Sequence, residues 1–212
     1  MPRGVAAGNH GRDGFAAGSR RGAATARILE FCPDSASTSR RLCESQSFWQ
    51  MPGVKIRYAK DADLDGLEGL ERQSFASDRL ARRSLRRLIS HPTAALRVAA
   101  EEPGGPVHGY GLVLFRKGSS VARLYSIAVA ARQRGAGFGR QLLADAEAVA
   151  AGRGHRVLRL EVREDNRGAI RFYEAKGYRL IGRREAYYAD GMDALRYEKA
   201  LARTRPARRR GN

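Results

Sequence analysis

The stretch IAVAARQRGAGFGRQLL, Ile127 to Leu143, decides the fold class. It begins with apolar residues typical of a buried strand, continues through a turn that contains Gly135, Gly137 and Gly139, and ends in residues with helical spacing. Glycine has no side chain, so the backbone of such a turn can approach a ligand closely. The first N–H groups of the helix lack intrahelical acceptors, and the helix dipole adds positive charge there. The stretch therefore predicts an anion site that suits a pyrophosphate.

Other interpretations of this turn fit less well. The glycines could simply permit positive φ in a tight turn, but the flanking Arg132, Arg134 and Arg140 favour an anion site. A dinucleotide-binding fold requires G-x-G-x-x-G, and Arg140 stands at the third glycine position. Glu161 lies at the distance where that fold has its acidic residue, but in mid-strand rather than at a strand end. The Walker pattern fails because no Gly-Lys-Ser/Thr follows the turn.

Outward from this stretch, strand and helix patterns follow one another in a regular order. Alternating or continuous apolar residues predict strands at 55–58, 96–100, 107–115, 121–129, 157–163, 178–184 and 193–201. Helical spacing predicts helices at 61–75, 79–90, 138–151 and 166–176. The resulting order, β-α-α-β-β-β-α-β-α-β-β, predicts an α/β domain with a mixed sheet and helices on both faces.

The two ends of the chain differ from this regular part. Residues 1–52 are rich in Gly, Ala, Ser and Arg and show no sustained period, so we expect a disordered or weakly ordered extension. Met51 precedes the first strand, and translation from this residue is an alternative start. We expect one domain over residues 53–202 and an Arg-rich tail over residues 203–212.

The formal net charge of +18 suggests a polyanionic partner such as nucleic acid. However, 35 of the 40 basic residues are Arg, and Ala and Gly are abundant, so a compositional bias explains the charge equally well. A cofactor with several phosphates would also suit it. No apolar run approaches the roughly 18–20 residues that span a bilayer, and the first residues lack a secretory signal. We therefore expect a cytoplasmic protein without membrane association.

Cysteine and histidine residues predict no metal site. Cys32 and Cys43 form a lone pair without histidine at metal-ligand spacing, which indicates neither a zinc site nor a disulfide framework. His91, His108 and His155 are scattered beside turns, and we assign them no role.

The motif R-x-x-G-x-G, formed by Arg134, Gly137 and Gly139, resembles the coenzyme A motif of the Gcn5-related N-acetyltransferases (GNAT). The later stretch LRLEVREDNRGAIRFYEAKGYRLIGRREAYYADGMDALRYEKAL is similar to the branch with RimI-type ribosomal-protein-alanine acetyltransferases and the catalytic subunits of N-terminal acetyltransferases. The resemblance covers about residues 55–201 and is most specific from residue 127 onward. It implies a mixed, mostly antiparallel central sheet of about seven strands, splayed between the fourth and fifth strands.

The resemblance also implies acetyl-CoA as co-substrate. Backbone N–H groups of the turn would bind its pyrophosphate, and the main chain of the preceding strand would pair with its pantetheine arm. Asn166 would donate a further hydrogen bond, although a helix N-cap is an equally good interpretation of this residue. The expected cofactor-binding residues are Ile127, Ala128, Val129, Arg134, Gly135, Ala136, Gly137, Phe138, Gly139, Arg140 and Asn166.

Tyr173 is the expected general acid. It lies two helical turns after Asn166 on the same helix face, and in the family a tyrosine at this place protonates the departing thiolate. The reference pKa values are about 10 for tyrosine and about 8.5 for a thiol, so this transfer is only mildly uphill. The alternative is a core aromatic residue beside Phe172.

Glu161 is the expected general base, because RimI-type enzymes use a glutamate at the corresponding place. Strand alternation puts it on one face with Arg159 and Arg163. An ion pair with one of these arginines is therefore an equal alternative to catalysis.

The acceptor is expected to be a primary amine that attacks acetyl-CoA directly in a ternary complex. Tyr187 and Tyr188 occupy the loop that, in this branch, closes over a peptide N-terminus; edge packing is their alternative. An α-amine is roughly 10% neutral at pH 7, whereas a lysine amine is about 3.5 kcal/mol harder to deprotonate. A protein or peptide α-amine is thus the first expectation. A small-molecule amine, or a nucleic-acid- or ribosome-associated acetyl-CoA-binding module without turnover, remains an alternative.

Overall fold

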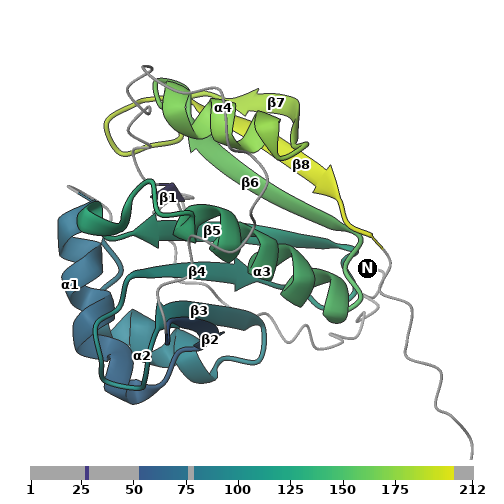
Figure 1. Ribbon diagram of the computed structural model, residues 1–212. Coiled ribbons are helices and arrows are strands. Elements are labelled where there is room, and N and C mark those ends of the chain that lie inside the picture. The colour runs from purple at the N-terminus through teal and green to yellow at the C-terminus, as the bar shows by residue number, and fades with distance from the viewer. Residues whose placement is uncertain (1–26, 29–52, 76–78, 203–212) are drawn as a thin grey trace, which may run out of the picture.

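One mixed β-sheet joins all the strands that the structure describes (Figure 1). The computed structural model describes residues 27–28, 53–75 and 79–202. The strands are β1 (Arg27–Ile28), β2 (Lys55–Tyr58), β3 (Ala94–Ala100), β4 (Gly109–Leu114), β5 (Val121–Val129), β6 (Val157–Arg163), β7 (Arg179–Arg184) and β8 (Ala194–Ala200). The helices are α1 (Leu64–Ser74), α2 (Arg82–Ser90), α3 (Phe138–Gly152) and α4 (Arg167–Ala175), with short 3-10 helices η1 (Asp61–Asp63) and η2 (Ala131–Gln133).

The strand order is β2-β3-β4-β5-β6-β8-β7, with β1 beside β5. The β5–β6 pair is parallel, and the other pairs in this order are antiparallel. The predicted mixed, mostly antiparallel sheet of about seven strands is therefore confirmed. The sequence analysis did not predict β1, which pairs with β5 in parallel.

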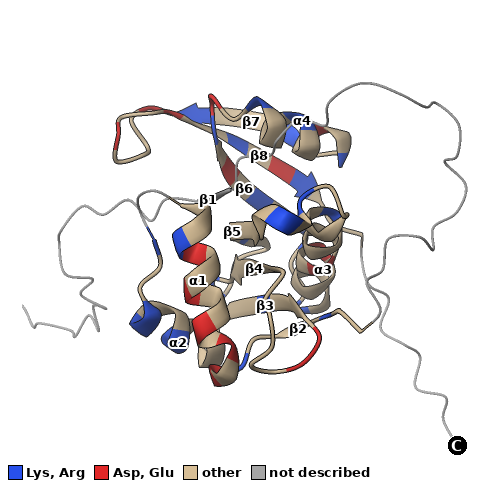
Figure 2. Cartoon of the chain, turned by 60° about the vertical axis from the view of Figure 1, so that its left-hand side comes forward, with Lys and Arg blue, Asp and Glu red and all other residues tan. Residues whose placement is uncertain are grey.

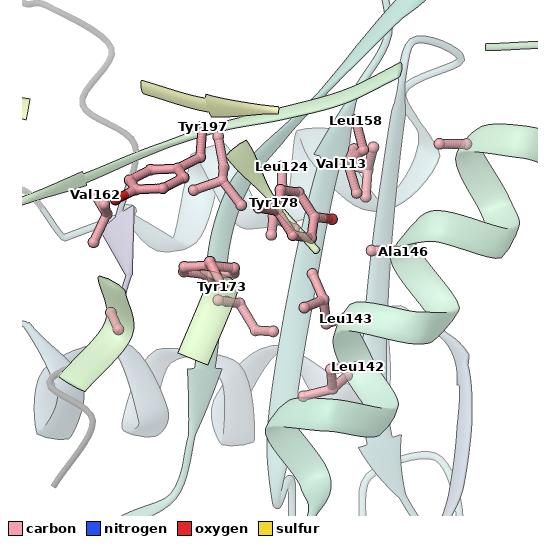
Figure 3. Close-up of a cluster of buried hydrophobic side chains, with 14 of the residues drawn as sticks. Val113, Leu124, Leu142, Leu143, Ala146, Leu158, Val162, Tyr173, Tyr178 and Tyr197 are labelled. Carbon is pink, nitrogen blue, oxygen red and sulfur yellow. The ribbon is translucent and has the colours of Figure 1, made fainter. Parts of the chain in front are cut away.

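Helices cover both faces of the sheet, because successive side chains of a strand point to opposite faces. On β3, Ala95 and Ala99 belong to the core with α3 and α4, whereas Leu96 and Val98 pack in the core with α1 and α2. Figure 3 shows the first of these cores, in which Leu142, Leu143 and Ala146 of α3 lie near Leu124, Leu158 and Tyr173. Each leucine that is fully buried here contributes about 1.5–3 kcal/mol by leaving water.

A β-bulge in β5 bends this strand away from β6. Leu124 lies opposite Val113 and Ser126 opposite Leu112, so Tyr125 is an extra residue in the ladder. A bulge bends its strand and can terminate pairing. The pairing of β5 with β6 accordingly ends at Leu124, one residue before the bulge. The two strands then diverge (Figure 1), which is the predicted splay between the fourth and fifth predicted strands.

β1 lies at the open end of this gap. Arg27 pairs with Ser126 and Ile28 with Ile127, and β1 contacts both β5 and β6 (Figure 1). The main-chain edge of β5 that the bulge exposes is therefore partly covered by the chain's own N-terminal part. The remainder of the predicted extension, including Met51, lies outside the described residues, as does the tail over residues 203–212.

Candidate active site

The glycine turn presents backbone N–H groups at the start of α3. Gly135 and Gly137 both have φ of 81°, a left-handed conformation that favours glycine, and Gly137 is the N-cap of α3. The N–H groups of Arg134 and Ala136 bond to carbonyls within the turn at 3.3 Å. The remaining N–H groups have no acceptor among the described residues: those of Gly135, Gly137, Phe138, Gly139 and Arg140. The turn that the sequence predicts for an anion thus has five donors available.

The side chains around this turn are basic. Arg132, Arg134 and Arg140 are all exposed and flank the open N–H groups. Arginine binds phosphate oxygens with two parallel hydrogen bonds, and the positive end of the α3 dipole adds to the attraction. The turn therefore combines backbone donors and cations, which suits a pyrophosphate.

The strand edge that was assigned to the pantetheine arm lies along the gap. Ile127, Ala128 and Val129 pair with β4 on one side and face the gap on the other. β1 pairs at Ser126 and Ile127 of this edge. A ligand arm on the same edge would have to share it with β1 or displace it.

Asn166 is the N-cap of α4, because its Oδ1 accepts a hydrogen bond of 3.0 Å from the N–H of Ala169. The capping interpretation of this residue is thus confirmed. Its contact with a cofactor stays a prediction.

Tyr173 lies fully inside the core, yet its hydroxyl has no hydrogen-bond partner among the described residues. The ring makes edge contacts with Phe172 and Tyr178 at centroid distances of 5.2 and 5.5 Å. Burial, and to a lesser extent the neighbouring Tyr188, raises the pKa of Tyr173, so the hydroxyl keeps its proton at neutral pH. A buried hydroxyl without a partner costs about 1–3 kcal/mol. The ring is part of the core, while the hydroxyl remains a proton donor without an acceptor.

Glu161 is buried and pairs with Arg123 of β5, whose Nε lies 2.9 Å from Oε2 of Glu161. The expected ion pair with Arg159 or Arg163 is wrong. Arg159 lies opposite Glu198 on β8 and binds it at 2.7 Å.

Arg163 is also engaged elsewhere, because it binds Asp165 and Asp190 at 3.0 and 2.9 Å. The neighbours of Glu161 in its own strand thus have partners of their own. Arg123 reaches Glu161 instead because β5 runs beside β6 up to the start of the gap.

Tyr187 and Tyr188 are almost fully buried in the loop between β7 and β8. Their rings meet edge to face at 5.3 Å, and the guanidinium of Arg163 lies 4.8 Å from the centre of the Tyr188 ring. The hydroxyl of Tyr187 accepts a hydrogen bond from Nη2 of Arg123. Tyr187 thus reaches β5 through Arg123, whereas Tyr188 packs beside Arg163 of β6.

Arg123 links Glu161 to Tyr187, and the ring of Tyr188 packs on that of Tyr187. Burial raises the pKa of Tyr188, and the nearby Tyr187 and Glu161 add to this effect, while Tyr188 in turn acts on Tyr173. Tyr173 packs with α3 and α4, whereas Glu161 faces the opposite side of the sheet, as the alternation of β6 requires. The structure therefore joins Glu161 and Tyr187 through Arg123 beside the gap, whereas Tyr173 lies in the core on the other face of the sheet.

Two groups in this region were missed by the sequence analysis. Arg123 gave a signal, because a charged residue inside an otherwise apolar strand needs a partner. A buried network also links Glu71 of α1, Tyr110 of β4 and Ser126 of β5: the Tyr110 hydroxyl donates to Glu71 and lies 2.7 Å from Ser126 Oγ. The sequence had no signal for this network, since its members lie far apart in the chain.

The remaining titratable residues form no further centre. Within residues 27–28, 53–75 and 79–202, no group of three or more His, Cys, Asp or Glu side chains is placed to hold a metal ion. His108 stacks on Phe138 and His155 on Phe115. In the same part of the chain, no helix has the length and apolarity needed to cross a membrane.

The sequence matches the model of the acetyltransferase (GNAT) family over residues 64–178, just over half of the chain. The protein therefore belongs to the GNAT acetyltransferase family and is an N-acetyltransferase by class. Compared by sequence with curated proteins, the chain has no match.

Solved structures with the same fold include three N-acetyltransferases. The ribosomal-protein-S18-alanine N-acetyltransferase of Escherichia coli has a TM-score of 0.62 and 23% identity, covering 72% of this chain and 97% of its own. The ribosomal-protein-alanine N-acetyltransferase of Brucella melitensis has a TM-score of 0.59 and 25% identity, covering 69% and 99%. NAA60 of Arabidopsis thaliana, in complex with a bisubstrate analogue, has a TM-score of 0.62 and 16% identity, covering 71% and 99%.

Proposed function

We propose that the protein transfers the acetyl group of acetyl-CoA to the α-amine of a protein or peptide. The observation that carries this proposal is the buried Tyr173 hydroxyl, which keeps its proton and has no acceptor among the described residues. An acid placed in this way serves a leaving group that enters the gap between β5 and β6.

The residues present fit the parts of coenzyme A. The five available N–H groups at the start of α3 and the three exposed arginines suit the pyrophosphate. The edge of β5 along the gap suits the two amides of the pantetheine arm. The Tyr173 hydroxyl suits the sulfur. The pyrophosphate, the pantetheine amides and the sulfur of the co-substrate thus each have a counterpart in the chain.

Bound acetyl-CoA supplies an acetyl group activated as a thioester. In the transfer, the amine nitrogen bonds to the acetyl carbon, the carbon–sulfur bond breaks, the amine loses a proton and the sulfur gains one. Tyr173 donates the proton to the sulfur. Glu161 accepts the proton of the amine, directly or through water, while Arg123 holds its carboxylate.

Two considerations support an α-amine as acceptor. An α-amine is about 3.5 kcal/mol easier to deprotonate than a lysine amine, so it demands less of a base that is held by an arginine. The buried Tyr187–Tyr188 loop stands where the family resemblance places the closure over a peptide N-terminus. Cytoplasmic location and association with nucleic acid or ribosomes stay predictions.

The test is a screen of the purified protein with acetyl-CoA against four acceptor classes: N-terminal peptides, lysine peptides, polyamines and aminoglycosides. Thiol release and the mass of the product are followed together. We expect the highest kcat/KM with an N-terminal peptide. Preference for a polyamine or aminoglycoside would replace the acceptor proposed here, and acetyl-CoA binding without any turnover would indicate a binding module.

A further inference from the structure

Arg123 joins two parts of the site that are far apart in the sequence. Its Nε donates to Glu161 of β6 at 2.9 Å, and its Nη2 donates to the hydroxyl of Tyr187 in the β7–β8 loop. Arg123 stands on β5, two residues before the bulge at Tyr125 where the gap begins. One guanidinium thus ties the candidate base and the acceptor-side loop to the strand that borders the cofactor gap.

Because these partners are buried, the contact with Arg123 matters for the charge of Glu161. The side chain of Glu161 is 4% exposed, so its carboxylate depends on Arg123 for compensation of a buried charge. Burial alone would lower the pKa of Arg123, but the charge of Glu161 and the contact with Tyr187 raise it overall. The guanidinium therefore stays charged throughout the working pH range.

A planar guanidinium also fixes the orientation of the groups that it binds. Its donors form a rigid fork, so a carboxylate and a hydroxyl that bind the same fork are oriented relative to each other. A lysine ammonium could supply the charge but could not reproduce this geometry.

We propose that Arg123 is a positioning residue for acetyl transfer, which orients the Glu161 carboxylate and docks the Tyr187 loop at the reaction centre. This inference rests on the proposed function. It goes further by assigning a role to a residue outside the sequence motifs of the site.

The chain offers a matched control in Arg159. It lies directly opposite Arg123 on β6, and it pairs with Glu198 at 2.7 Å. The side chains of Arg159 and Arg123 are 31% and 29% exposed. Loss of either arginine removes one ion pair from the same region of the sheet, but the partner of Arg159 is more exposed and only Arg123 contacts the site.

The experiment is a double-mutant cycle on kcat with Arg123→Gln, Glu161→Gln and the double variant, beside Arg159→Gln. Because small misplacements of catalytic groups are costly, we expect Arg123→Gln to lower kcat about 10- to 100-fold. The kcat of the double variant should be no lower than that of the slower single variant, because both substitutions disable the same Arg123–Glu161 unit. Arg159→Gln should keep the kcat of the wild type with a smaller loss in Tm than Arg123→Gln, and Arg123→Lys should recover part of the loss in kcat.

Several outcomes would overturn the inference: a kcat of Arg123→Gln equal to that of Arg159→Gln, or losses that multiply in the double variant. If Arg123→Gln does not fold, Arg123→Lys with Tyr187→Phe carries the same cycle. Acetyl-CoA affinity, measured by calorimetry, should stay at the wild-type value in every variant. A wild-type protein without turnover would overturn both the proposed function and this inference. If the wild-type protein turns over and the Arg123 variants behave like Arg159→Gln, only the role of Arg123 is overturned.

Discussion

Buried polar side chains stand where β5 meets its neighbours. Glu71 and Ser126 share a hydrogen-bond network through Tyr110, and Glu161 is held by Arg123. Partners of this kind offset the cost of taking a polar group out of water. The Tyr173 hydroxyl differs because none of the residues that the structure describes offsets its burial with a hydrogen bond. A protein that keeps such a group gives up stability at a place where a proton donor is useful.

Tyr173→Phe removes this hydroxyl and keeps the ring in the core. We expect kcat to fall by about 10²-fold or more at every pH, because a positioned acid contributes about 10²–10⁴-fold. Acetyl-CoA affinity should stay close to wild type, and Tm should not fall. Tyr178→Phe is the matched control, since Tyr178 lies in the same core but its hydroxyl bonds to Glu147 at 3.1 Å. Equal kcat values for the two variants would remove Tyr173 from the mechanism.

We expect the stability of the fold to depend on pH through Asp63. Burial alone would raise the pKa of Asp63, but hydrogen bonds from Arg57, Lys60 and Gly104 outweigh it, so the folded-state pKa is lowered. A lowered pKa stabilises the fold above the unfolded-state value of about 3.9 and ceases to do so as the pH falls through the folded-state value. Asp63→Asn should therefore cost about 2 kcal/mol of unfolding free energy at pH 7 and progressively less below pH ~4.

Urea unfolding across this pH range measures the difference. The exposed Asp65, changed to Asn, serves as the control and should cost much less at pH 7, because surface ion pairs contribute little. If Asp63→Asn lowered the free energy of unfolding by the same amount at pH 7 and below pH ~4, the lowered pKa of Asp63 would be contradicted.

At the scale of elements, the bulge in β5 produces the site. It ends the pairing with β6 at Leu124 and opens the gap, while the glycine turn after the same strand starts α3. One strand thus borders the gap, leads to the anion turn and carries Arg123. An insertion or deletion near Tyr125 would displace all three features together.

Gly139→Asp tests the anion turn. Gly139 lies within α3, and an added Cβ would only meet Val129 Cγ2 at 3.9 Å, so the fold tolerates a side chain there. Gly137 is less suitable, because its φ of 81° strains any larger residue. An acid in the first helical turn stabilises the helix, but it repels the pyrophosphate. We expect acetyl-CoA affinity to fall at least about tenfold by calorimetry, with little change in Tm.

Gly139→Ala is the control for this substitution and should bind nearly as well as wild type. Equal affinity of the Asp and Ala variants would place the pyrophosphate elsewhere.

Removal of residues 1–50 tests the effect of β1. β1 pairs with β5 at Ser126 and Ile127, on the edge assigned to the pantetheine arm. If the ligand can bind only when β1 has left the edge, its apparent affinity equals the intrinsic affinity multiplied by the fraction of molecules in which the edge is open. Were one molecule in ten open, the shortened protein would bind acetyl-CoA about tenfold more tightly.

Ile28→Pro in the full chain removes a backbone N–H from β1 and should act in the same direction. Unchanged or weaker affinity in the shortened protein would show that β1 and the co-substrate do not compete.

At the scale of the whole molecule, charge is unevenly distributed. Figure 2 shows basic residues along α2 and acidic residues along α1. Arg82 pairs with Asp65 and Glu68 of α1, whereas Arg83, Arg86 and Arg87 are exposed. The five arginines of residues 203–212 contribute +5 to the net charge of +18. Any binding of a polyanion to these arginines would be driven by counterion release and would weaken with salt.

Removal of residues 203–212 should separate this property from catalysis. The last strand ends at Ala200, so acetyl-CoA binding and transfer should be unchanged. Nucleic-acid affinity should fall, and the slope of log affinity against log salt should flatten by up to about 4.5 if all five arginines contact phosphates. Filter binding at several salt concentrations measures this. Loss of acetyl-CoA binding would show instead that these residues belong to the domain.

Local patterns were sufficient for the secondary structure and for much of the site. The predicted strands 121–129 and 157–163 match β5 and β6, and the glycine turn starts α3 at Phe138 as predicted. Such features depend on residues close together in the chain, where periodicity and glycine content act directly. Asn166 and Tyr173 were chosen through the family resemblance, and helical spacing placed them on one face of their helix.

The tertiary structure decided what the sequence alone left open. Arg159 and Arg163 flank Glu161 in the strand, yet Arg123 is its partner, because the register of β5 beside β6 brings that guanidinium nearer. The Tyr173 hydroxyl has no hydrogen-bond partner within the described part of the chain, and β1 reaches β5 across about a hundred residues. Contacts between distant segments depend on register, bulges and packing, which no local pattern encodes. The sequence by itself thus determined the fold class and the anion turn, whereas only the tertiary structure decided which charges meet at the reaction centre.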